Sequence, residues 1–216
     1  MGSGNDQLWS YGNDWRWRVL DNYVIMPITI AGSGTITGLS AGGLPAGSVT
    51  GATLASGVGG KILQVVSTTK TDTESNSTAS EAFWTTGLTR AITPSSTSSK
   101  ILILGSIMAT SSGGKTIACQ LVTGNNVVLA AANADTASNR PLCHTSGYNA
   151  GSEDIPPMVL NHLHSPNTTS EIIYKVRLHH NSSNTYTLYL NRTSGDTDNA
   201  LIARYVSTIT CMEVAA

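Results

Sequence analysis

The stretch from residue 38 to residue 61, GLSAGGLPAGSVTGATLASGVGGK, is almost free of large and charged side chains. No Asp, Glu, Lys or Arg lies between Asp21 and Lys61. A single copy of such a stretch has too little apolar bulk to form a core. Within it, aliphatic residues recur at every fifth position, namely Leu39, Leu44, Val49 and Leu54. This spacing fits neither an amphipathic helix nor a half-buried strand, and the frequent Gly and Pro oppose a helix.

Two interpretations of residues 28–60 remain. In one, the Gly- and Ser-rich composition makes a flexible linker. In the other, which the regular aliphatic spacing favours, three copies run side by side. Each Leu or Val then meets its symmetry mates on a common axis, while the small residues let the backbones approach closely. The sequence therefore predicts an extended trimeric stalk over residues 28–60, with Leu39, Leu44, Val49 and Leu54 at the trimer axis.

Residues 1–27 are rich in aromatic side chains and hold three of the four tryptophans. Trp, Tyr and Arg are typical of interface hot spots, and a free tail gains nothing from exposing so much aromatic surface. We expect this segment to anchor the chain to a partner; the alternative is that it folds back onto its own domain. The predicted anchor residues are Trp9, Tyr11, Trp15, Arg16, Trp17, Arg18 and Tyr23.

From Lys61 onward, short apolar runs alternate with turn signals, a pattern typical of β-strands. The segments expected to form strands are KILQVV (61–66), KILILGSIM (100–108), TIACQLV (116–122), VVLAAA (127–132), PMVLNHLH (157–164), EIIYKVRLHH (171–180), TYTLYLN (185–191) and ARYVSTITCMEV (203–214). The first two are mostly apolar and are predicted to be largely buried. Eight or more antiparallel strands in about 155 residues predict an all-β, jelly-roll-like sandwich over residues 61–216, which forms a knob.

The clearest alternation lies in residues 171–180. Ile172, Tyr174, Val176 and Leu178 share one face of this predicted strand, and the charged residues share the other. Because the turn-like HNSSN separates it from the strand at 185–191, residues 171–191 are predicted to form a β-hairpin.

Charge and composition exclude several classes of partner. Charged residues make up 12% of the chain and its formal net charge is -1, so no broad field attracts nucleic acid or an anionic membrane. No run approaches the roughly 20 apolar residues of a membrane span, and the N-terminus lacks the pattern of a secretory signal. We expect neither nucleic acid nor membrane as a partner, and synthesis in the cytoplasm without secretion.

No catalytic motif is present: the chain has no G-x-S-x-G, no Walker-type glycine loop and no HExxH. Glu153 and Asp154 are sequence neighbours, so they do not face each other as a glycosidase pair does. The pair Asp196 and Asp198 offers too few ligands for calcium. The sequence predicts no enzyme, no catalytic residue and no cofactor.

Histidine and cysteine give no site by themselves. His162 and His164 lie on one strand face, and His179 and His180 end another predicted strand; they would suit zinc or nickel only if the two strands were adjacent. Solvent-facing or interface histidines are the default expectation, and no metal site is predicted. The three cysteines, Cys119, Cys143 and Cys211, form no CxxC pair and are expected to be buried free thiols.

Several runs resemble the stalk-to-knob region of virion structural proteins from tailed phages of cyanobacteria and marine bacteria. They are ITIAGSGTITGLSAGGLPAGSVTGATLASGVGGKILQVVSTTKTDT, LTRAITPSSTSSKILILGSI, SPNTTSEIIYKVRL and the closing STITCMEV. The resemblance covers about residues 28–216. It implies a trimeric β-rich knob on a virion, presented as a tail fibre, a head fibre or a capsid decoration. Residues 1–27 depart from the pattern, so the attachment point is not specified.

Two functions follow from these features. In the first, the chain is a homotrimeric capsid decoration or cement protein, which grips the major capsid protein or another virion protein through residues 1–27 and stabilises the head. In the second, it is a short tail or head fibre whose knob binds a host-surface glycan or protein, for example through the polar loop RPLCHTSGYNAGSED (140–154). A free sugar-binding module unconnected with a virus is a third possibility, because sandwich folds host many functions.

Overall fold

The computed structural model describes residues 29–30, 36–37, 61–80, 82–134, 139–151, 153–200 and 202–216. The chain divides into two compact units, residues 1–58 and residues 59–216. In the first unit, β1 (Thr29–Ile30) pairs antiparallel with β2 (Ile36–Thr37). The predicted anchor residues and the four predicted axis residues lie outside the described residues, and the stalk prediction stays a prediction.

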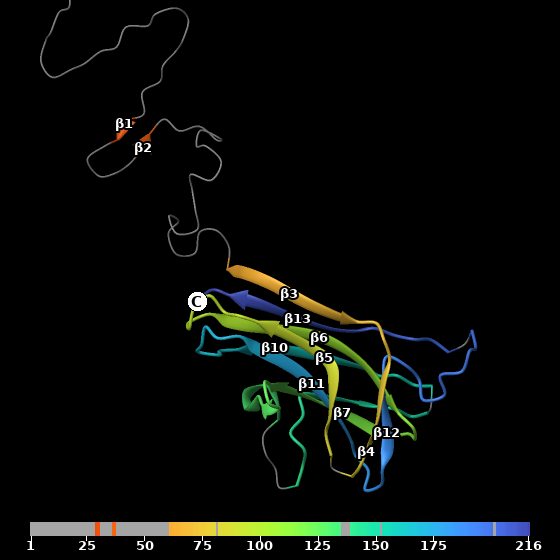
Figure 1. The fold of residues 1–216 in the computed structure, drawn as a ribbon. Coiled ribbons are helices and arrows are strands. Elements are labelled where there is room, and N and C mark those ends of the chain that lie inside the picture. The colour runs from red at the N-terminus through yellow and green to blue at the C-terminus, as the bar shows by residue number, and fades with distance from the viewer. Residues whose placement is uncertain are drawn as a thin grey trace, which may run out of the picture. The chain divides into compact units, whose positions relative to one another are not determined.

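The second unit contains two antiparallel sheets (Figure 1). The strands of the first sheet are β3 (Ile62–Lys70), β13 (Ser207–Val214), β6 (Lys100–Ser111), β10 (Pro157–His164), β12 (Tyr186–Leu190) and β4 (Glu74–Thr78). Those of the second are β5 (Trp84–Ile92), β11 (Ile172–His180), β7 (Thr116–Thr123), β8 (Val127–Val128) and β9 (Thr145–Tyr148). A short 3-10 helix, η2 (Ala130–Ala132), follows β8.

The strand order is that of a jelly roll. The eight main strands along the chain are β3, β5, β6, β7, β9, β10, β11 and β13. Numbered in that sequence, one sheet has the order 1-8-3-6 and the other 2-7-4-5, because the chain changes sheet at nearly every connection. This arrangement pairs the first strand with the last and leaves two sheets packed face to face. The predicted all-β, two-sheet sandwich is confirmed.

Alternating side chains from both sheets fill the space between them. Tyr174, Val176 and Leu178 of β11 are buried, as the alternation in residues 171–180 predicts. Burying one such aliphatic side chain contributes about 1.5–3 kcal/mol. The largest fully buried side chains are Tyr174, Leu88, Ile101, Ile103, Ile107, Ile117, Leu121, Met158, Leu160, Leu178, Leu188 and Leu190.

The predicted hairpin at 171–191 is wrong. β11 pairs with β5 and β7 in the second sheet, whereas β12 pairs with β4 and β6 in the first sheet. The turn between them carries the chain from one sheet to the other. Alternation shows whether a side chain faces the core or the outside. Because both strands turn their apolar face to the same core, the pattern does not distinguish a hairpin within one sheet from a connection between the two sheets.

Two strand predictions also change in extent. The segment 127–132 is only partly strand, because β8 ends at Val128 and the alanines form η2. The C-terminal strand begins at Ser207 rather than at Ala203. Among the described residues, no helix is long and apolar enough to cross a membrane.

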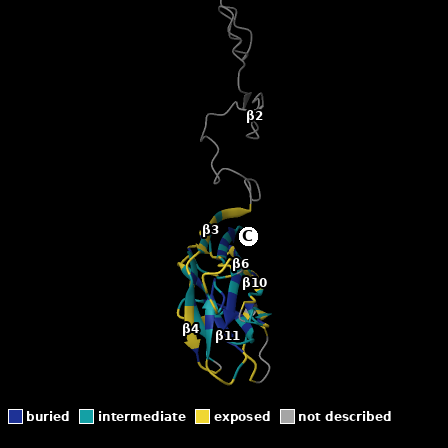
Figure 2. Ribbon diagram, turned by 90° about the vertical axis from the view of Figure 1, so that its right-hand side faces the viewer, coloured by how far each residue is buried: buried dark blue, intermediate teal, exposed yellow. Residues whose placement is uncertain are grey.

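The prediction that KILQVV forms a largely buried strand is wrong for its side chains. The strand is present as β3, yet Ile62, Leu63 and Val65 are 55%, 50% and 55% exposed. β3 is an edge strand of its sheet and, among the described residues, pairs only with β13. Its start is coloured exposed in Figure 2. The apolar side chains at the start of β3 are therefore not buried within a single sandwich.

Candidate interaction surface

The first sheet has an outer face that is turned away from the sandwich core and carries a single charged side chain among its outward positions, Lys100 at the start of β6. It is made by the outward positions of four adjacent strands, β3, β13, β6 and β10. These positions are Leu63, Val65, Ser67 and Thr69 on β3, Thr208, Thr210, Met212 and Val214 on β13, Lys100, Leu102, Leu104, Ser106 and Met108 on β6, and Pro157, Val159, Asn161 and Leu163 on β10. We call this set the outer face.

An apolar row crosses all four strands of the outer face. Met212 lies opposite Val65 on one side and opposite Leu102 on the other. Leu102 in turn lies opposite Leu163. Directly opposed side chains of antiparallel strands lie close enough to touch, so the row presents one continuous aliphatic band. Its two ends are the most open, since Val65 is 55% exposed and Leu163 is 47% exposed.

The outer face becomes polar with distance from this row. The next rows are Ser67, Thr210, Leu104 and Asn161, and then Thr69, Thr208, Ser106 and Val159. A shallow depression of about 310 Å³ lies here. Its lining residues are Leu104, Gly105, Ser106, Val159, Leu160, Asn161, Thr208 and Thr210. Neutral hydroxyl and amide groups, without a charged group, suit contact with another protein surface better than binding of an ion.

The outward side of the second sheet has a different character. Lys175 and Arg177 of β11 project there, opposite Thr89 and Thr85 of β5. The Arg177 guanidinium stacks over the ring of Phe83 at 4.8 Å. Charged and hydroxyl side chains on this side are the normal pattern of a sheet that faces water. The two sheets of one sandwich therefore present unlike surfaces.

A buried carboxylate lies on the inward side of the first sheet, beneath the open end of β3. Glu213 is 1% exposed, and its oxygens accept hydrogen bonds from Gln64 Nε2 at 2.6 Å, Ser95 N at 2.7 Å and Ser95 Oγ at 2.6 Å. Burial alone would raise the pKa of Glu213, but the hydrogen bonds from Ser95, Gln64 and Ser99 outweigh it and lower the pKa to about 2. The charged form ties β13 to β3 and to the segment that follows β5.

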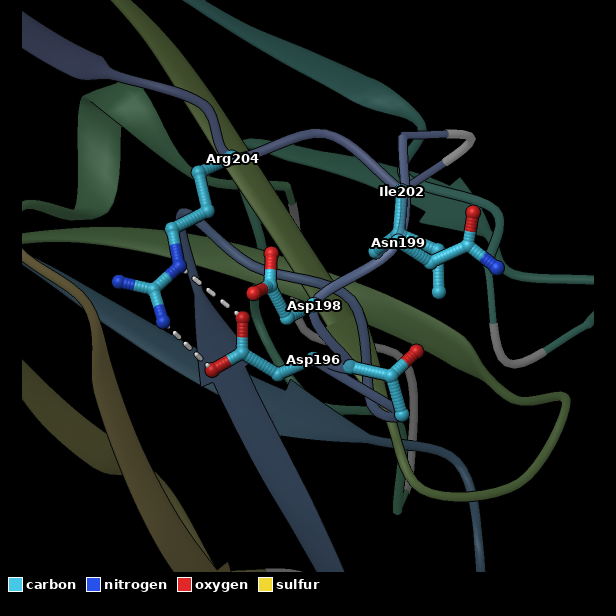
Figure 3. A pocket seen from close by; sticks show the side chains of 6 residues that line it. Asp196, Asp198, Asn199, Ile202 and Arg204 are labelled. Carbon is cyan, nitrogen blue, oxygen red and sulfur yellow. Dashed lines mark hydrogen bonds and ion pairs between the residues drawn. The ribbon is translucent and has the colours of Figure 1, made fainter.

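A second hollow lies in the loop between β12 and β13 (Figure 3). This pocket of about 320 Å³ is lined by Asp196, Thr197, Asp198, Asn199, Ile202 and Arg204. Asp196 Oδ2 accepts from Arg192 Nη1 at 3.0 Å and from Arg204 Nη2 at 2.9 Å, and its Oδ1 accepts from Arg204 Nε at 3.0 Å. Two guanidinium groups occupy this carboxylate, which makes it a poor calcium ligand. The arrangement serves to hold the loop.

The histidines that the sequence singled out do not converge. His162 and His164 lie on β10 in the first sheet, whereas His179 and His180 end β11 in the second. His179 and His180 are buried, so the default expectation of solvent-facing histidines is wrong for them. His164 Nδ1 lies 2.7 Å from Tyr174 Oη, and burial lowers the pKa of His164. Within the described parts of the chain, no group of three His, Cys, Asp or Glu residues could hold a metal ion.

The cysteines are free thiols in the structure. Cys119 and Cys211 are buried and Cys143 is half-buried. Burial raises the pKa of Cys143 to about 11 and of Cys211 to about 12. Protonated, shielded thiols are packing groups rather than nucleophiles.

Sequence reasoning missed the outer face. Its residues lie on four strands that are distant in the chain, and their adjacency follows from the jelly-roll order. A signal was present all the same: residues 61–66 and 100–108 carry apolar side chains at both inward and outward positions. In an antiparallel sheet with one wet face, such runs indicate burial on both sides.

Comparison with known proteins gives a distant likeness. No protein-family model matches the chain, and no curated protein matches it. The chain is similar to solved structures of infectious bursal disease virus: its T=1 particles (13% identity, TM-score 0.37), its Gx strain (12%, 0.36) and its VP2 subviral particle (14%, 0.32). In each case 71% of this chain is covered, but only 36%, 38% and 37% of the viral chain. These TM-scores carry no functional argument, and the jelly-roll assignment rests on the strand order.

Proposed function

We propose that the chain is a non-enzymatic virion structural protein, a homotrimer that is attached to the particle through residues 1–27. The observation that carries the proposal is the junction at residue 61. A charge-free, small-residue stretch runs there directly into the first strand of a jelly roll, and this junction resembles that of phage virion proteins. The jelly roll is a fold of viral capsid and lectin domains, among others.

The role that we favour is capsid decoration, in which the protein cements the head. The aromatic anchor would grip the major capsid protein or another virion protein. Three linked anchors raise the effective concentration of each contact, so that weak individual contacts add up to stable attachment. Anchor, stem and knob all fit in one chain of 216 residues.

Copy number tests this role. We expect quantitative mass spectrometry of purified particles to find on the order of hundreds of copies, because a shell of repeated capsomers offers that many equivalent sites. A count of a few copies to a few dozen would contradict the decoration role and leave the fibre role.

The second candidate is a short tail or head fibre whose knob binds a host-surface glycan or protein. The feature that favours it is β9 and its flanks within residues 140–154. Tyr148 is 65% exposed there, beside Asn, Ser and Gly residues. Exposed Tyr with adaptable polar neighbours is typical of recognition loops. Binding of the purified trimer to host cells, lost in a Tyr148→Ala variant that keeps its oligomeric mass, would favour this role.

A further inference from the structure

We propose that the outer face is the contact between copies of this chain, and that it turns toward the threefold axis of the trimer. The inference rests on the proposed trimer and assigns the surface that the knobs use to make it. Other copies of the same chain thus cover the outer face, one copy on its β3 side and another on its β10 side.

Exposure of apolar side chains is the first ground. Leu63 and Val65 at one edge of the outer face and Val159 and Leu163 at the other are between 47% and 59% exposed in a single copy. Scattered exposed aliphatic residues are ordinary, but Val65 and Leu163 join through Met212 and Leu102 into one band. A continuous apolar patch of this kind marks an interaction site.

The place where the chain enters the sandwich is the second ground. In the sequence, 61 residues precede β3, and they lead into Ile62, beside the apolar row of the outer face. If copies associate through residues 28–60, as their aliphatic spacing predicts, the starts of β3 in the three copies are brought together. The apolar row begins only three residues further on, at Val65. The rows of Thr and Ser lie farther from this point.

Charge is the third ground. One charged side chain, Lys100, stands at the start of β6 opposite Val214 and is exposed; the rows from Leu102 onward are neutral, so there identical faces meet without repulsion and without desolvating an ion. A strongly charged partner would find no charged side chain to pair with in these neutral rows. The outward side of the second sheet, with Lys175 and Arg177, is the side that remains suited to water.

The row also offers two apolar halves, one on the β3 side and one on the β10 side. A face that is turned to a threefold axis meets both neighbours, one with each half. Val65 and Met212 of one copy, on the β3 side, would then face Leu102 and Leu163 of the next copy, on the β10 side. Both halves are aliphatic, so the same row supplies both partners of each contact.

Thiol labelling of the full chain tests the proposal. In a Cys143→Ser background, which removes the half-buried thiol, Val65→Cys places a thiol on the outer face. Val127→Cys is the matched control, because Val127 is 63% exposed on β8 of the second sheet. Light scattering gives the mass of each variant, circular dichroism its fold, and a maleimide reagent the labelling rate. Leu163→Cys repeats the measurement at the other edge if Val65→Cys does not fold.

We expect a trimer in which the thiol from Val65→Cys reacts at least about tenfold more slowly than the thiol from Val127→Cys, because an interface core excludes water and reagent. A trimer in which both thiols react equally fast overturns the outer face as the contact and leaves the proposed trimeric virion protein in place. A folded chain with monomer mass overturns both the outer-face contact and the trimer.

Discussion

At the scale of single residues, Glu213 shows how a charge can stabilise an all-β core. Its carboxylate is enclosed and receives hydrogen bonds from Gln64 and Ser95. Such a group stabilises the fold only while it is ionised, because its folded pKa lies near 2, below its ordinary value of 4.5.

We expect Glu213→Gln to lower the free energy of unfolding by about 1–3 kcal/mol at neutral pH, because the charge-assisted hydrogen bonds are lost. In the parent chain, the stabilisation by Glu213 is fully present above about pH 4.5 and is lost as the pH falls toward 2. The Gln variant should lack this acid-dependent component. Urea titrations between pH 2 and 7 measure both effects. Glu171→Gln, at an exposed position, is the control. If Glu171→Gln lowered the free energy of unfolding as much as Glu213→Gln, the explanation would be wrong.

Asn191 joins three strand ends from one buried position. Its Nδ2 donates to the carbonyl oxygens of Lys70 at 2.8 Å and Asp72 at 3.0 Å, and its Oδ1 accepts from Ser207 Oγ at 2.6 Å. Its φ of 63° lies in the left-handed region, which Asn tolerates better than most residues.

We expect Asn191→Ala to cost about 2–4 kcal/mol, because it strands buried polar groups and strains the backbone. Asn191→Gly relieves the strain but should keep most of the loss. Asn126 has a similar φ of 64° at an exposed turn, so Asn126→Ala should cost only about 1 kcal/mol. Equal losses at Asn191 and Asn126 in thermal unfolding would show that the backbone conformation, not the hydrogen bonds, decides the cost.

At the scale of strands, the contact between β6 and its neighbours depends on Gly105. A Cβ added there would lie 2.8 Å from the carbonyl oxygen of Thr208 on β13 and 3.1 Å from Leu160 Cδ1 on β10. No side chain fits between these three strands without a shift of the backbone.

Gly105→Ala is therefore expected to destabilise the sandwich by about 1–3 kcal/mol through overpacking. Gly151→Ala is the matched control, since its added Cβ would make only an ordinary contact with Asp154 at 3.4 Å. Chemical denaturation of both variants decides the point: a stable Gly105→Ala chain would mean that β13 and β10 can separate at no cost.

Strands also show how far the sequence predicts the fold. Residues 157–164 form β10 as predicted, and the inward residues of β11 are those that its alternation indicates. β4, β5 and β9 were not predicted, because ESNST, WTTGLTRAI and TSGY mix Gly, Ser and Thr with few apolar residues. Strand pairing could not be predicted from the sequence, because it depends on which sheet each turn leads to. The outer face, built from pairing, was hidden for the same reason.

At the scale of the whole molecule, the sandwich and the segment before it have separate tasks under the proposed function. The core of the described sandwich is formed by side chains between Leu88 and Cys211, whereas the predicted anchor residues lie outside the described part of the chain. Removing the anchor should leave folding of the jelly roll unchanged.

Deletion of residues 1–27 is expected to give a folded trimer that no longer joins particles. Analytical ultracentrifugation measures the mass, and co-sedimentation with particles that lack the protein measures attachment. The full chain is the positive control. Complete decoration of particles by the shortened chain would contradict the anchor. Loss of the trimer would indicate that residues 1–27 contribute to the contact between copies.

The position of β13 has a consequence for biogenesis. This last strand lies between β3 and β6, the first and third main strands. Until the ribosome has released it, the nascent sheet has a strand-wide opening with unpaired backbone on both sides, which can accept the same segment from a neighbouring nascent copy. If the proposed trimer forms, we therefore expect productive maturation to require that each polypeptide close its own opening before the other copies pack against it.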